Sequence, residues 1–301
     1  MTKYLKLLRV EQWVKNAFVF LPLFFSGNFF QEGLLLQSIY AFVVFSLTAS
    51  CIYIVNDYSD IEADKKHPEK KYRPLASGAI SKPLALSILA SLILGIVGLM
   101  WFGQQYFGIN IWKFGAIILF YFVMIWGYTF HLKHVAIIDV CIVSLGFVLR
   151  VLAGGYATGI PISQWAILLT FVLALVLALG KRRGELINAQ ISGKTRKALD
   201  GYNVQFADIA LSISVTLAII CYLMFTVTPE VQSKFGMKIF YTVLFVGFAF
   251  LRYLQQTLVY NKTESPTKIV YKDRYIQITI LLWMMSFLFL IYHQYLIGAK
   301  G

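Results

Sequence analysis

Residues 34–55 read LLLQSIYAFVVFSLTASCIYIV and contain no charged side chain. An apolar run of about 20 residues is long enough for an α-helix to cross the hydrocarbon core of a bilayer. Residues 56–74 follow at once and read NDYSDIEADKKHPEKKYRP, in which acidic and basic side chains crowd together. The stretch therefore predicts a membrane-spanning helix that leads directly into a charged segment, and a plain connection between two helices would not need so many charges.

The composition of the whole chain also indicates a membrane protein. Hydrophobic residues make up 59% of the 301 residues, charged residues make up 14%, and the mean hydropathy is +0.71. These values lie far from those of a soluble globular domain. The predicted fold class is an all-α polytopic membrane protein, formed by a single transmembrane domain over residues 1–301. Nine apolar blocks are expected to form its spanning helices: 14–31, 34–55, 83–102, 112–130, 136–156, 162–180, 206–228, 238–258 and 276–297.

Basic residues gather in alternate connections between these blocks. Most of the 27 lysines and arginines lie before the first block or within 65–82, 131–135, 181–197 and 262–274, whereas the opposite connections carry only Lys234. Loops rich in lysine and arginine stay in the cytoplasm, so the N-terminus is predicted to lie inside and the C-terminus outside. Topology alone can explain this basic face. The alternative is that the same face also attracts an anionic substrate.

The acidic residues of the charged segment are spaced for one face of a helix. Asp57, Asp60 and Asp64 lie three and four residues apart, so they share a face if the helix continues past the membrane surface, while Glu62 points elsewhere. Like charges on one face repel each other unless a cation lies between them. Hard carboxylate oxygens suit Mg²⁺, and Asn56 adds a neutral oxygen at the same place.

Basic residues follow the three aspartates directly. Their charge is able to neutralise phosphate oxygens that a metal does not reach. The segment therefore predicts a Mg²⁺–diphosphate site at a helix end, and the alternative is a solvated loop. The basic residues expected to bind substrate here are Lys65, Lys71 and Arg73.

A second candidate cluster lies in residues 127–155, GYTFHLKHVAIIDVCIVSLGFVLRVLAGG. Asp139 and Arg150 are about 20° apart round a helix and roughly 16 Å apart along it, with Gly146 between them on the same face. Ionisable residues within a span almost always face the bundle interior or a watery cavity. We therefore expect this face to line a pocket that opens to the cytoplasm, within reach of Tyr128 and Lys133.

A third cluster, LGKRRGEL at residues 179–186, lies at the cytoplasmic end of the sixth block. Lys181, Arg182 and Arg183 are candidates to hold phosphate, or else anchor the span at the headgroups. An anchor at the headgroups would not need the acidic residue Glu185. The sequence contains no Walker-type phosphate loop, no dinucleotide-binding glycine pattern and no C-x-x-C pair, and nothing in it indicates a nucleic-acid partner.

The segment NDYSDIEADKKHPEKKYRPLASG resembles the N-D-x-x-D-x-x-x-D signature of the UbiA-type superfamily of intramembrane prenyltransferases. This resemblance implies a helical bundle around a central cavity open to the cytoplasm. Quinone-type members of the superfamily commonly carry a second signature, D-x-x-x-D, at the start of the fifth span, where this chain has Lys133 and the single Asp139. This departure points to one branch of the superfamily, the decaprenyl-phosphate phosphoribosyltransferases. Four further segments of the chain are similar to the same branch: LRVEQWVKNAFVFLPL, GFVLRVLAGGYATG, KRRGEL and SPTKIVYKDRYIQ.

The resemblance implies a reaction and its partners. Members of this branch transfer 5-phosphoribosyl from 5-phosphoribosyl 1-diphosphate to a polyprenyl monophosphate and release diphosphate, in the synthesis of cell-envelope polysaccharide precursors. By this resemblance Asp57, Asp60 and Asp64 hold Mg²⁺ and act in catalysis with Asp139, and Lys15 and Asn16 join the substrate-binding residues. The enzyme is expected in the inner membrane of a prokaryote. Its active-site loops, at about 56–82, 131–135 and 181–205, are expected on the cytoplasmic side.

Two other functions remain as alternatives. An ordinary prenyltransferase would move a prenyl group from prenyl diphosphate to an aromatic or lipid acceptor on the same fold. The single Asp139 and the surplus of cations count against it. A transporter would place ionisable residues near the middle of the membrane within repeated halves, and no such repeat is evident. A homo-oligomer is compatible with the sequence.

Overall fold

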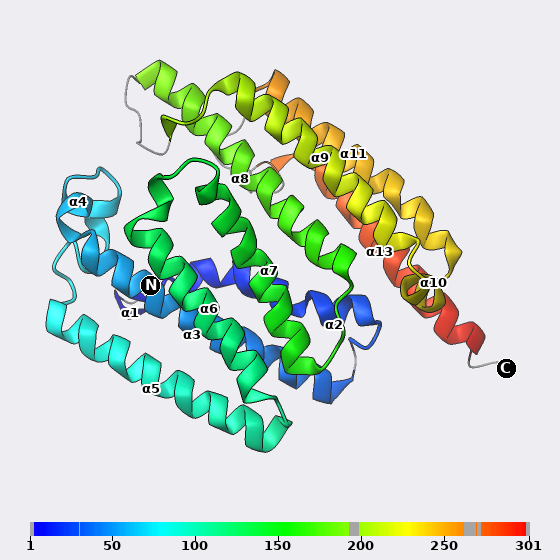
Figure 1. Ribbon diagram of the computed structural model, residues 1–301, viewed down its shortest axis with the longest axis horizontal. Helices are drawn as coiled ribbons and strands as arrows, with labels where there is room; N and C mark the ends of the chain where they lie inside the picture. The colour runs from blue at the N-terminus through cyan, green and yellow to red at the C-terminus, as the bar shows by residue number, and fades with distance from the viewer. Residues whose placement is uncertain (1–2, 30, 193–198, 262–268, 270–271, 299–301) are drawn as a thin grey trace. The chain divides into compact units, whose positions relative to one another are not determined.

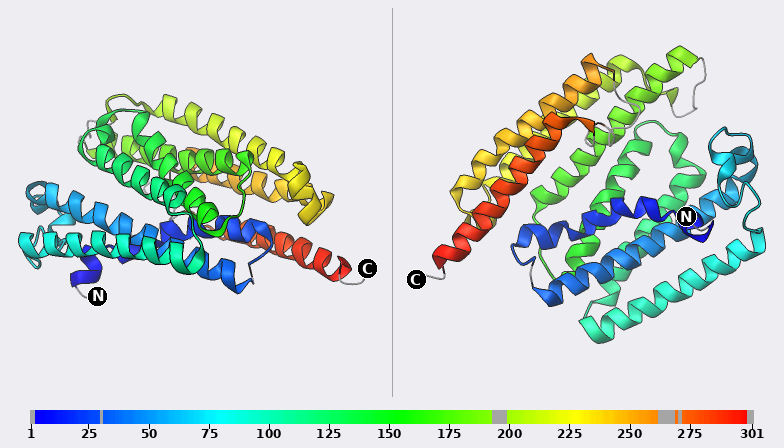
Figure 2. Two further views of the ribbon diagram at one scale, coloured as in Figure 1. Left: turned by 60° about the horizontal axis from the view of Figure 1, so that its bottom comes forward. Right: turned by 180° about the vertical axis from the view of Figure 1, so that it is seen from behind.

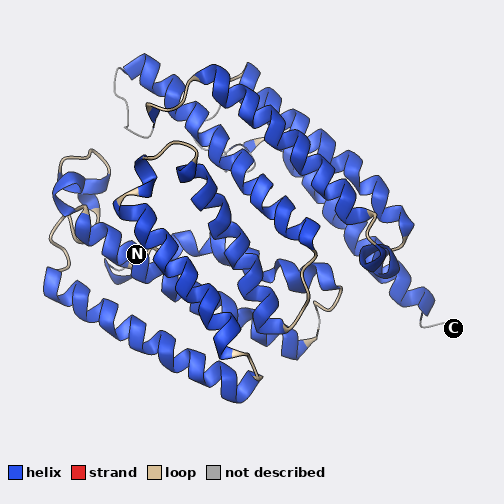
Figure 3. Ribbon diagram, in the orientation of Figure 1, coloured by secondary structure: helices blue, strands red, loops and turns tan. Residues whose placement is uncertain are grey.

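The computed structural model describes residues 3–29, 31–192, 199–261, 269 and 272–298. Within these ranges every regular element is a helix, and Figure 3 accordingly shows no strand. The all-α prediction is confirmed. Several basic residues that contribute to the predicted topology, Lys194, Arg196, Lys197, Lys262 and Lys268, lie outside the described residues.

The helices form two compact units, and one of the points where the chain passes between them falls inside the helix α7. One unit comprises Met1–Phe130 and Leu149–Ile162, and the other comprises His131–Val148 and Ser163–Gly301. The first unit contains α1 (Lys3–Leu7), η1 (Val10–Phe20), α2 (Leu21–Ser26), α3 (Glu32–Ser59), α4 (Ile61–Lys65), η2 (Lys70–Tyr72), α5 (Lys82–Phe107), α6 (Ile111–Phe130) and the end of α7 (Ile138–Thr158). The second contains η3 (Leu132–His134), the start of α7, α8 (Gln164–Ser192), α9 (Val204–Thr226), α10 (Pro229–Phe235), η5 (Met237–Thr242), α11 (Val243–Leu254), η6 (Gln255–Val259) and α13 (Arg274–Gly298).

Seven helical segments in the described part of the chain are long and apolar enough to cross a membrane. They are Glu32–Ser59, Lys82–Phe107, Ile111–Phe130, Ile138–Thr158, Gln164–Gln190, Val204–Thr226 and Met237–Val259, and Arg274–Leu290 is a shorter apolar segment. The chain is therefore a multi-pass membrane protein, although the predicted number of nine spans is not confirmed.

The first predicted span, 14–31, is not one α-helix. A 3₁₀ segment, η1, is followed by the short helix α2, which has Pro22 in its first turn. Proline fits the first turn of a helix but cannot continue one, because it lacks a backbone N–H. Gly27 then ends α2 in the left-handed conformation, with φ 75°, which glycine adopts without steric cost.

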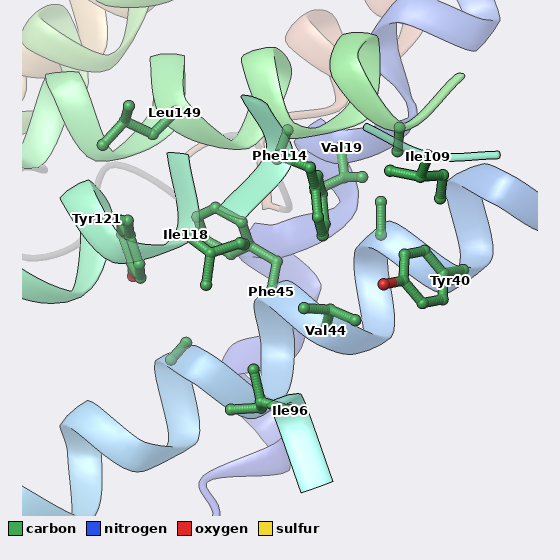
Figure 4. Close-up of a cluster of buried hydrophobic side chains, with 14 of the residues drawn as sticks. Val19, Tyr40, Val44, Phe45, Ile96, Ile109, Phe114, Ile118, Tyr121 and Leu149 are labelled. Carbon is green, nitrogen blue, oxygen red and sulfur yellow. The ribbon is translucent and has the colours of Figure 1, made fainter. Parts of the chain in front are cut away.

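In the first unit, α3 packs against η1, α5 and α6. Figure 4 shows the apolar cluster at these contacts, in which the Phe45 ring lies 4.4 Å from the ring of Tyr121. The η1 backbone approaches α7 closely: a Cβ atom on Gly154 would lie 2.0 Å from the Val19 carbonyl oxygen. Gly154 is therefore required for η1 to pack where it does.

In the second unit, α8 packs along α9, and α11 packs along α13. Figures 1 and 2 show each of these pairs side by side. Their apolar faces enclose a second buried cluster that includes Val176, Leu211, Val215, Tyr253 and Ile276. This packing fixes the C-terminal half of α8, where LGKRRGEL lies.

Candidate active site

The charged segment begins where α3 ends. The spacing argument assumed one continuous helix through the three aspartates, but the structure shows a break. The helix α3 ends at Ser59, Asp60 has φ −94° and ψ 6°, and α4 begins at Ile61. Asp57 and Asp64 are nevertheless brought together, because the Arg73 side chain contacts both of them.

Asp57 and Asp64 form the buried acidic pair of the first unit, each with only 2% of its surface exposed. Arg73 Nη1 donates to Asp57 Oδ1 at 3.2 Å and to Asp64 Oδ2 at 2.6 Å. Lys70 Nζ lies 3.9 Å from Asp64 Oδ1, and Arg9 forms an ion pair with Asp57 Oδ1. Buried carboxylates are stable only when paired in this way. The sequence analysis expected Arg73 to bind substrate phosphate, and in the structure its guanidinium pairs with the two aspartates.

The arrangement leaves oxygen donors that fit a divalent cation. Asp57 Oδ2 is buried and has no hydrogen-bond partner among the described residues. Asp60 Oδ2 accepts from Asn56 Nδ2 at 3.2 Å, one helical turn from Asp57. Asp64 is less suited, since its two oxygens face Arg73 and Lys70. Within the described residues no group of three or more His, Cys, Asp or Glu side chains forms a ready metal cluster.

The other charged side chains of this segment lie at the surface. Glu62 is exposed and accepts from Lys65 Nζ at 2.8 Å, and this hydrogen bond lowers the pKa of the Glu62 carboxyl. Glu62 thus points away from the buried pair, as its spacing predicts. Lys71 is exposed, with its ammonium 5.1 Å from the centre of the Tyr72 ring. The structure therefore places Arg73 at the buried pair and leaves Lys65 and Lys71 outside it.

Arg9 is a site residue that the sequence analysis did not identify. It lies between α1 and η1 in the left-handed conformation, with its guanidinium 4.9 Å from the centre of the Tyr53 ring. Its partner Asp57 is 48 residues away in the sequence. No local spacing rule connects positions so far apart, and the sequence offered only a basic residue a few positions before the first apolar block, within the segment LRVEQWVKNAFVFLPL.

Arg150 lies in a second buried cluster of the first unit. Its Nε donates to Asn16 Oδ1 at 2.8 Å, and its Nη2 donates to Tyr121 Oη at 3.0 Å. Asn16 Nδ2 in turn donates to Ser46 Oγ at 3.0 Å. The structure therefore brings together two predicted substrate-binding residues, Asn16 and Arg150. Lys15, their neighbour in η1, is exposed.

Asp139 has its own partners in the second unit. It is completely buried, and its Oδ2 accepts from Arg182 Nε at 2.6 Å while its Oδ1 accepts from Tyr202 Oη at 2.8 Å. The Ile137 N–H donates to the same Tyr202 oxygen at 2.6 Å, and Ile137 has φ 70°, which is rare for a β-branched residue. Burial raises the pKa of Tyr202, and its hydrogen bond to Asp139 adds to the rise, so the phenol stays a proton donor.

The basic residues of LGKRRGEL also lie close to carboxylates other than Asp139. Glu185 accepts from Arg182 and lies 4.0 Å from Lys181 Nζ, which explains its presence among the basic residues. Arg183 forms an ion pair with Asp208 and donates to the Thr257 carbonyl oxygen at 2.6 Å. Tyr202 and Asp208 are further residues that the sequence analysis missed. Tyr128 in α6 and Lys133 in η3 are both half-buried.

Comparison with known proteins identifies relatives along almost the whole chain. A model of the UbiA prenyltransferase family matches residues 17–281. A Mycolicibacterium smegmatis protein named decaprenyl-phosphate phosphoribosyltransferase is 34% identical over 93% of this chain and 89% of its own length. Proteins of the same name from Mycobacterium tuberculosis and Corynebacterium glutamicum are 33% and 32% identical, over 93% and 96% of this chain and 91% and 86% of their own lengths.

Solved structures show the same fold at lower identity. A UbiA homologue from Archaeoglobus fulgidus, bound to GPP and Mg²⁺, has a TM-score of 0.66 and 18% identity, over 97% of this chain and 100% of that chain. A digeranylgeranylglyceryl phosphate synthase has a TM-score of 0.66 and 19% identity, over 96% and 98% of the two chains.

Proposed function

The chain belongs to the UbiA prenyltransferase family, and from this premise we propose that it is a polyprenyl-phosphate phosphoribosyltransferase. It transfers 5-phosphoribosyl from 5-phosphoribosyl 1-diphosphate to a decaprenyl-like polyprenyl monophosphate and releases diphosphate. The product serves cell-envelope polysaccharide synthesis. The shared name of the mycobacterial and corynebacterial relatives supports a polyprenyl phosphate as the acceptor and phosphoribosyl as the transferred group.

The observation that carries the proposal is the bonding of Asp139. A prenyltransferase with two acidic signatures has a second set of carboxylates available for a metal–diphosphate group. Here both oxygens of the buried Asp139 accept hydrogen bonds, from Arg182 and from Tyr202. A phosphate monoester acceptor is already anionic and needs cations more than it needs a second carboxylate pair. The site chemistry therefore favours phosphoribosyl transfer over prenyl transfer.

In the proposed reaction, an oxygen of the acceptor phosphate attacks the anomeric carbon of the donor. The bond from that carbon to the diphosphate oxygen breaks, and the electron pair leaves with diphosphate. Arg73, held between Asp57 and Asp64, supplies guanidinium N–H groups for the departing diphosphate. Lys70 adds positive charge beside Asp64. In the first unit, Arg150 and Asn16 are proposed to bind a substrate group. In the second unit, Lys133 and the cations at 181–183 are separately proposed as substrate-binding residues.

Mg²⁺ is the proposed cofactor, with Asp57 Oδ2, Asp60 and Asn56 as the oxygen donors that fit it. When bound, the cation neutralises negative charge that develops on the diphosphate. Asp64 contributes through Arg73, whose guanidinium it orients.

Two further features belong to the same proposal. The two compact units work as one domain, because α7 contributes to both and the family match covers residues from both. The distribution of the basic connections supports an N-terminus and active-site loops on the cytoplasmic side of a prokaryotic inner membrane.

A two-donor assay tests the function on detergent-purified protein with Mg²⁺. One reaction contains labelled 5-phosphoribosyl 1-diphosphate and polyprenyl phosphate, and the other contains labelled polyprenyl diphosphate and an aromatic acceptor. Label is expected in a lipid-soluble product of the first reaction alone, and a chelator should abolish it. Product from the second reaction alone would show that the chain is a prenyltransferase and would overturn the substrate assignment.

Asp57→Asn should reduce phosphoribosyl transfer at least about 100-fold, because it removes a charged oxygen donor and one side of the Arg73 pair. Glu62→Gln is the matched control, since Glu62 is an exposed acid of the same segment, and it should keep normal activity. Near-normal turnover by a folded Asp57→Asn protein would refute the site.

A further inference from the structure

Arg9 is held firmly in an uncommon conformation beside Asp57. Its φ of 49° and ψ of 49° lie in the left-handed region, which residues other than glycine rarely adopt. The surrounding backbone is tied on both sides: the Gln12 N–H donates to the Arg9 carbonyl oxygen at 2.8 Å, and Ser50 Oγ donates to the Leu8 carbonyl oxygen at 2.8 Å. Conformations of this kind persist where the fold enforces them, often at functional sites.

The Arg9 guanidinium has donors to spare. Its Nη2 pairs with Asp57 Oδ1, its guanidinium carbon lies over the Tyr53 ring, and 18% of the side chain is exposed. A guanidinium has five N–H donors in a fixed fork, which matches phosphate oxygens. Within the described part of the chain, Asp57 is the one acceptor that the Arg9 guanidinium contacts. Its remaining donors are therefore available to an anion bound beside Asp57.

Arg9 also opposes a cation that approaches the same carboxylate. Asp57 Oδ1 already faces two guanidinium groups, from Arg9 and Arg73, while Oδ2 has no hydrogen-bond partner in the described residues. A divalent cation that arrives alone at Oδ2 meets the repulsion of both arginines as well as the attraction of the carboxylate. A diphosphate that arrives with it offsets this repulsion and gives the guanidinium groups an anion to bind.

We infer that Arg9 is a diphosphate-binding residue that couples divalent cation and diphosphate, so that the two bind together at Asp57 and neither binds well alone. The inference rests on the proposed function for the identity of the donor substrate. It adds a residue to the site, and it assigns that residue two effects of opposite sign: attraction of the diphosphate and repulsion of the lone cation.

The test compares the full-length wild-type protein with Arg9→Gln, Arg9→Lys and the control Lys6→Gln. Lys6 is an exposed basic residue of α1, so this control removes the same charge close by in the sequence. Inorganic diphosphate is titrated by calorimetry in the presence of Mg²⁺. In a separate measurement, Mn²⁺ alone, as a paramagnetic substitute for Mg²⁺, is titrated by electron paramagnetic resonance.

Arg9→Gln should weaken diphosphate binding about 10- to 100-fold, the usual effect of losing a charge-assisted contact. The same variant should bind Mn²⁺ alone several-fold more tightly than wild type, because one repulsive charge is gone. Arg9→Lys keeps the charge but loses the fork, so it should recover diphosphate binding only in part and leave Mn²⁺ binding as in wild type. Lys6→Gln should change neither titration.

Two outcomes would overturn the inference: unchanged diphosphate binding in Arg9→Gln, or parallel weakening of diphosphate and Mn²⁺ binding, which indicates structural damage. Either result leaves the proposed function standing if wild-type protein still transfers phosphoribosyl. Conversely, the expected opposite shifts in a protein that forms no phosphoribosyl lipid would support Arg9 and refute the donor–acceptor assignment.

Discussion

Asp57 and Asp139 are both buried aspartates that pair with arginine, but they differ in how many of their carboxylate oxygens accept hydrogen bonds. Asp57 keeps one buried oxygen without a partner in the described residues, whereas both oxygens of Asp139 accept hydrogen bonds. A partly bonded carboxylate beside guanidinium groups is suited to take up a cation, and a fully bonded one is suited to hold other side chains in place. We propose on this basis that Asp139 positions Arg182.

Substitution of Tyr202, the second hydrogen-bond partner of Asp139, tests the structural part of this role. Tyr202→Phe removes the hydroxyl that donates to Asp139 and accepts from the Ile137 N–H. The loss should cost about 1–3 kcal/mol of stability, because the buried Asp139 carboxylate and the Ile137 N–H each lose a hydrogen-bond partner. Thermal unfolding of purified protein in detergent measures this cost. Tyr241→Phe, at a residue 67% exposed, is the control and should unfold as wild type does. Equal unfolding temperatures for the two variants would contradict the role of Tyr202.

At the scale of elements, η1 determines the geometry of the first unit's site. It carries Asn16 to Arg150, and it follows directly from Arg9, which pairs with Asp57. A 3₁₀ segment of this length is uncommon. This one packs against α3, and its backbone lies against α7 at Gly154. The element that the sequence suggested as an ordinary span is thus the one that holds two clusters of polar side chains in place.

Gly154 gives a direct test of the η1 packing. Gly154→Ala places a methyl group 2.0 Å from the Val19 carbonyl oxygen, so η1 or α7 must shift. We expect a loss of about 1–3 kcal/mol in stability, as is usual for overpacking, measured by thermal unfolding. Gly98→Ala is the matched control in α5, because a Cβ there meets nothing within 4 Å. It should be neutral or stabilising, since alanine favours helix over glycine. Equal destabilisation by both substitutions would refute the packing argument.

For the whole molecule, the uneven distribution of basic residues predicts a topology that labelling can test. Ser77 follows the charged segment and Ser233 lies in α10, on connections predicted to face opposite sides of the membrane, and both are exposed. With the three native cysteines replaced, a membrane-impermeant maleimide added to intact spheroplasts should label Ser233→Cys but not Ser77→Cys. Both should react after permeabilisation. Labelling of Ser77→Cys alone in intact spheroplasts would reverse the proposed orientation.

The sequence by itself determined the membrane class, the helical fold, the family resemblance and the position of the acidic segment. Apolar runs and acidic spacing are local patterns, and membrane insertion and helix formation depend on local patterns. Only the tertiary structure decided which charges meet. Asp57 pairs with Arg9 across 48 residues, Asp139 with Arg182 across 43, and Asn16 with Arg150 across 134. Such pairs depend on how separate helices pack, and on the need of each buried charge or amide for a partner, which no spacing rule along the chain contains.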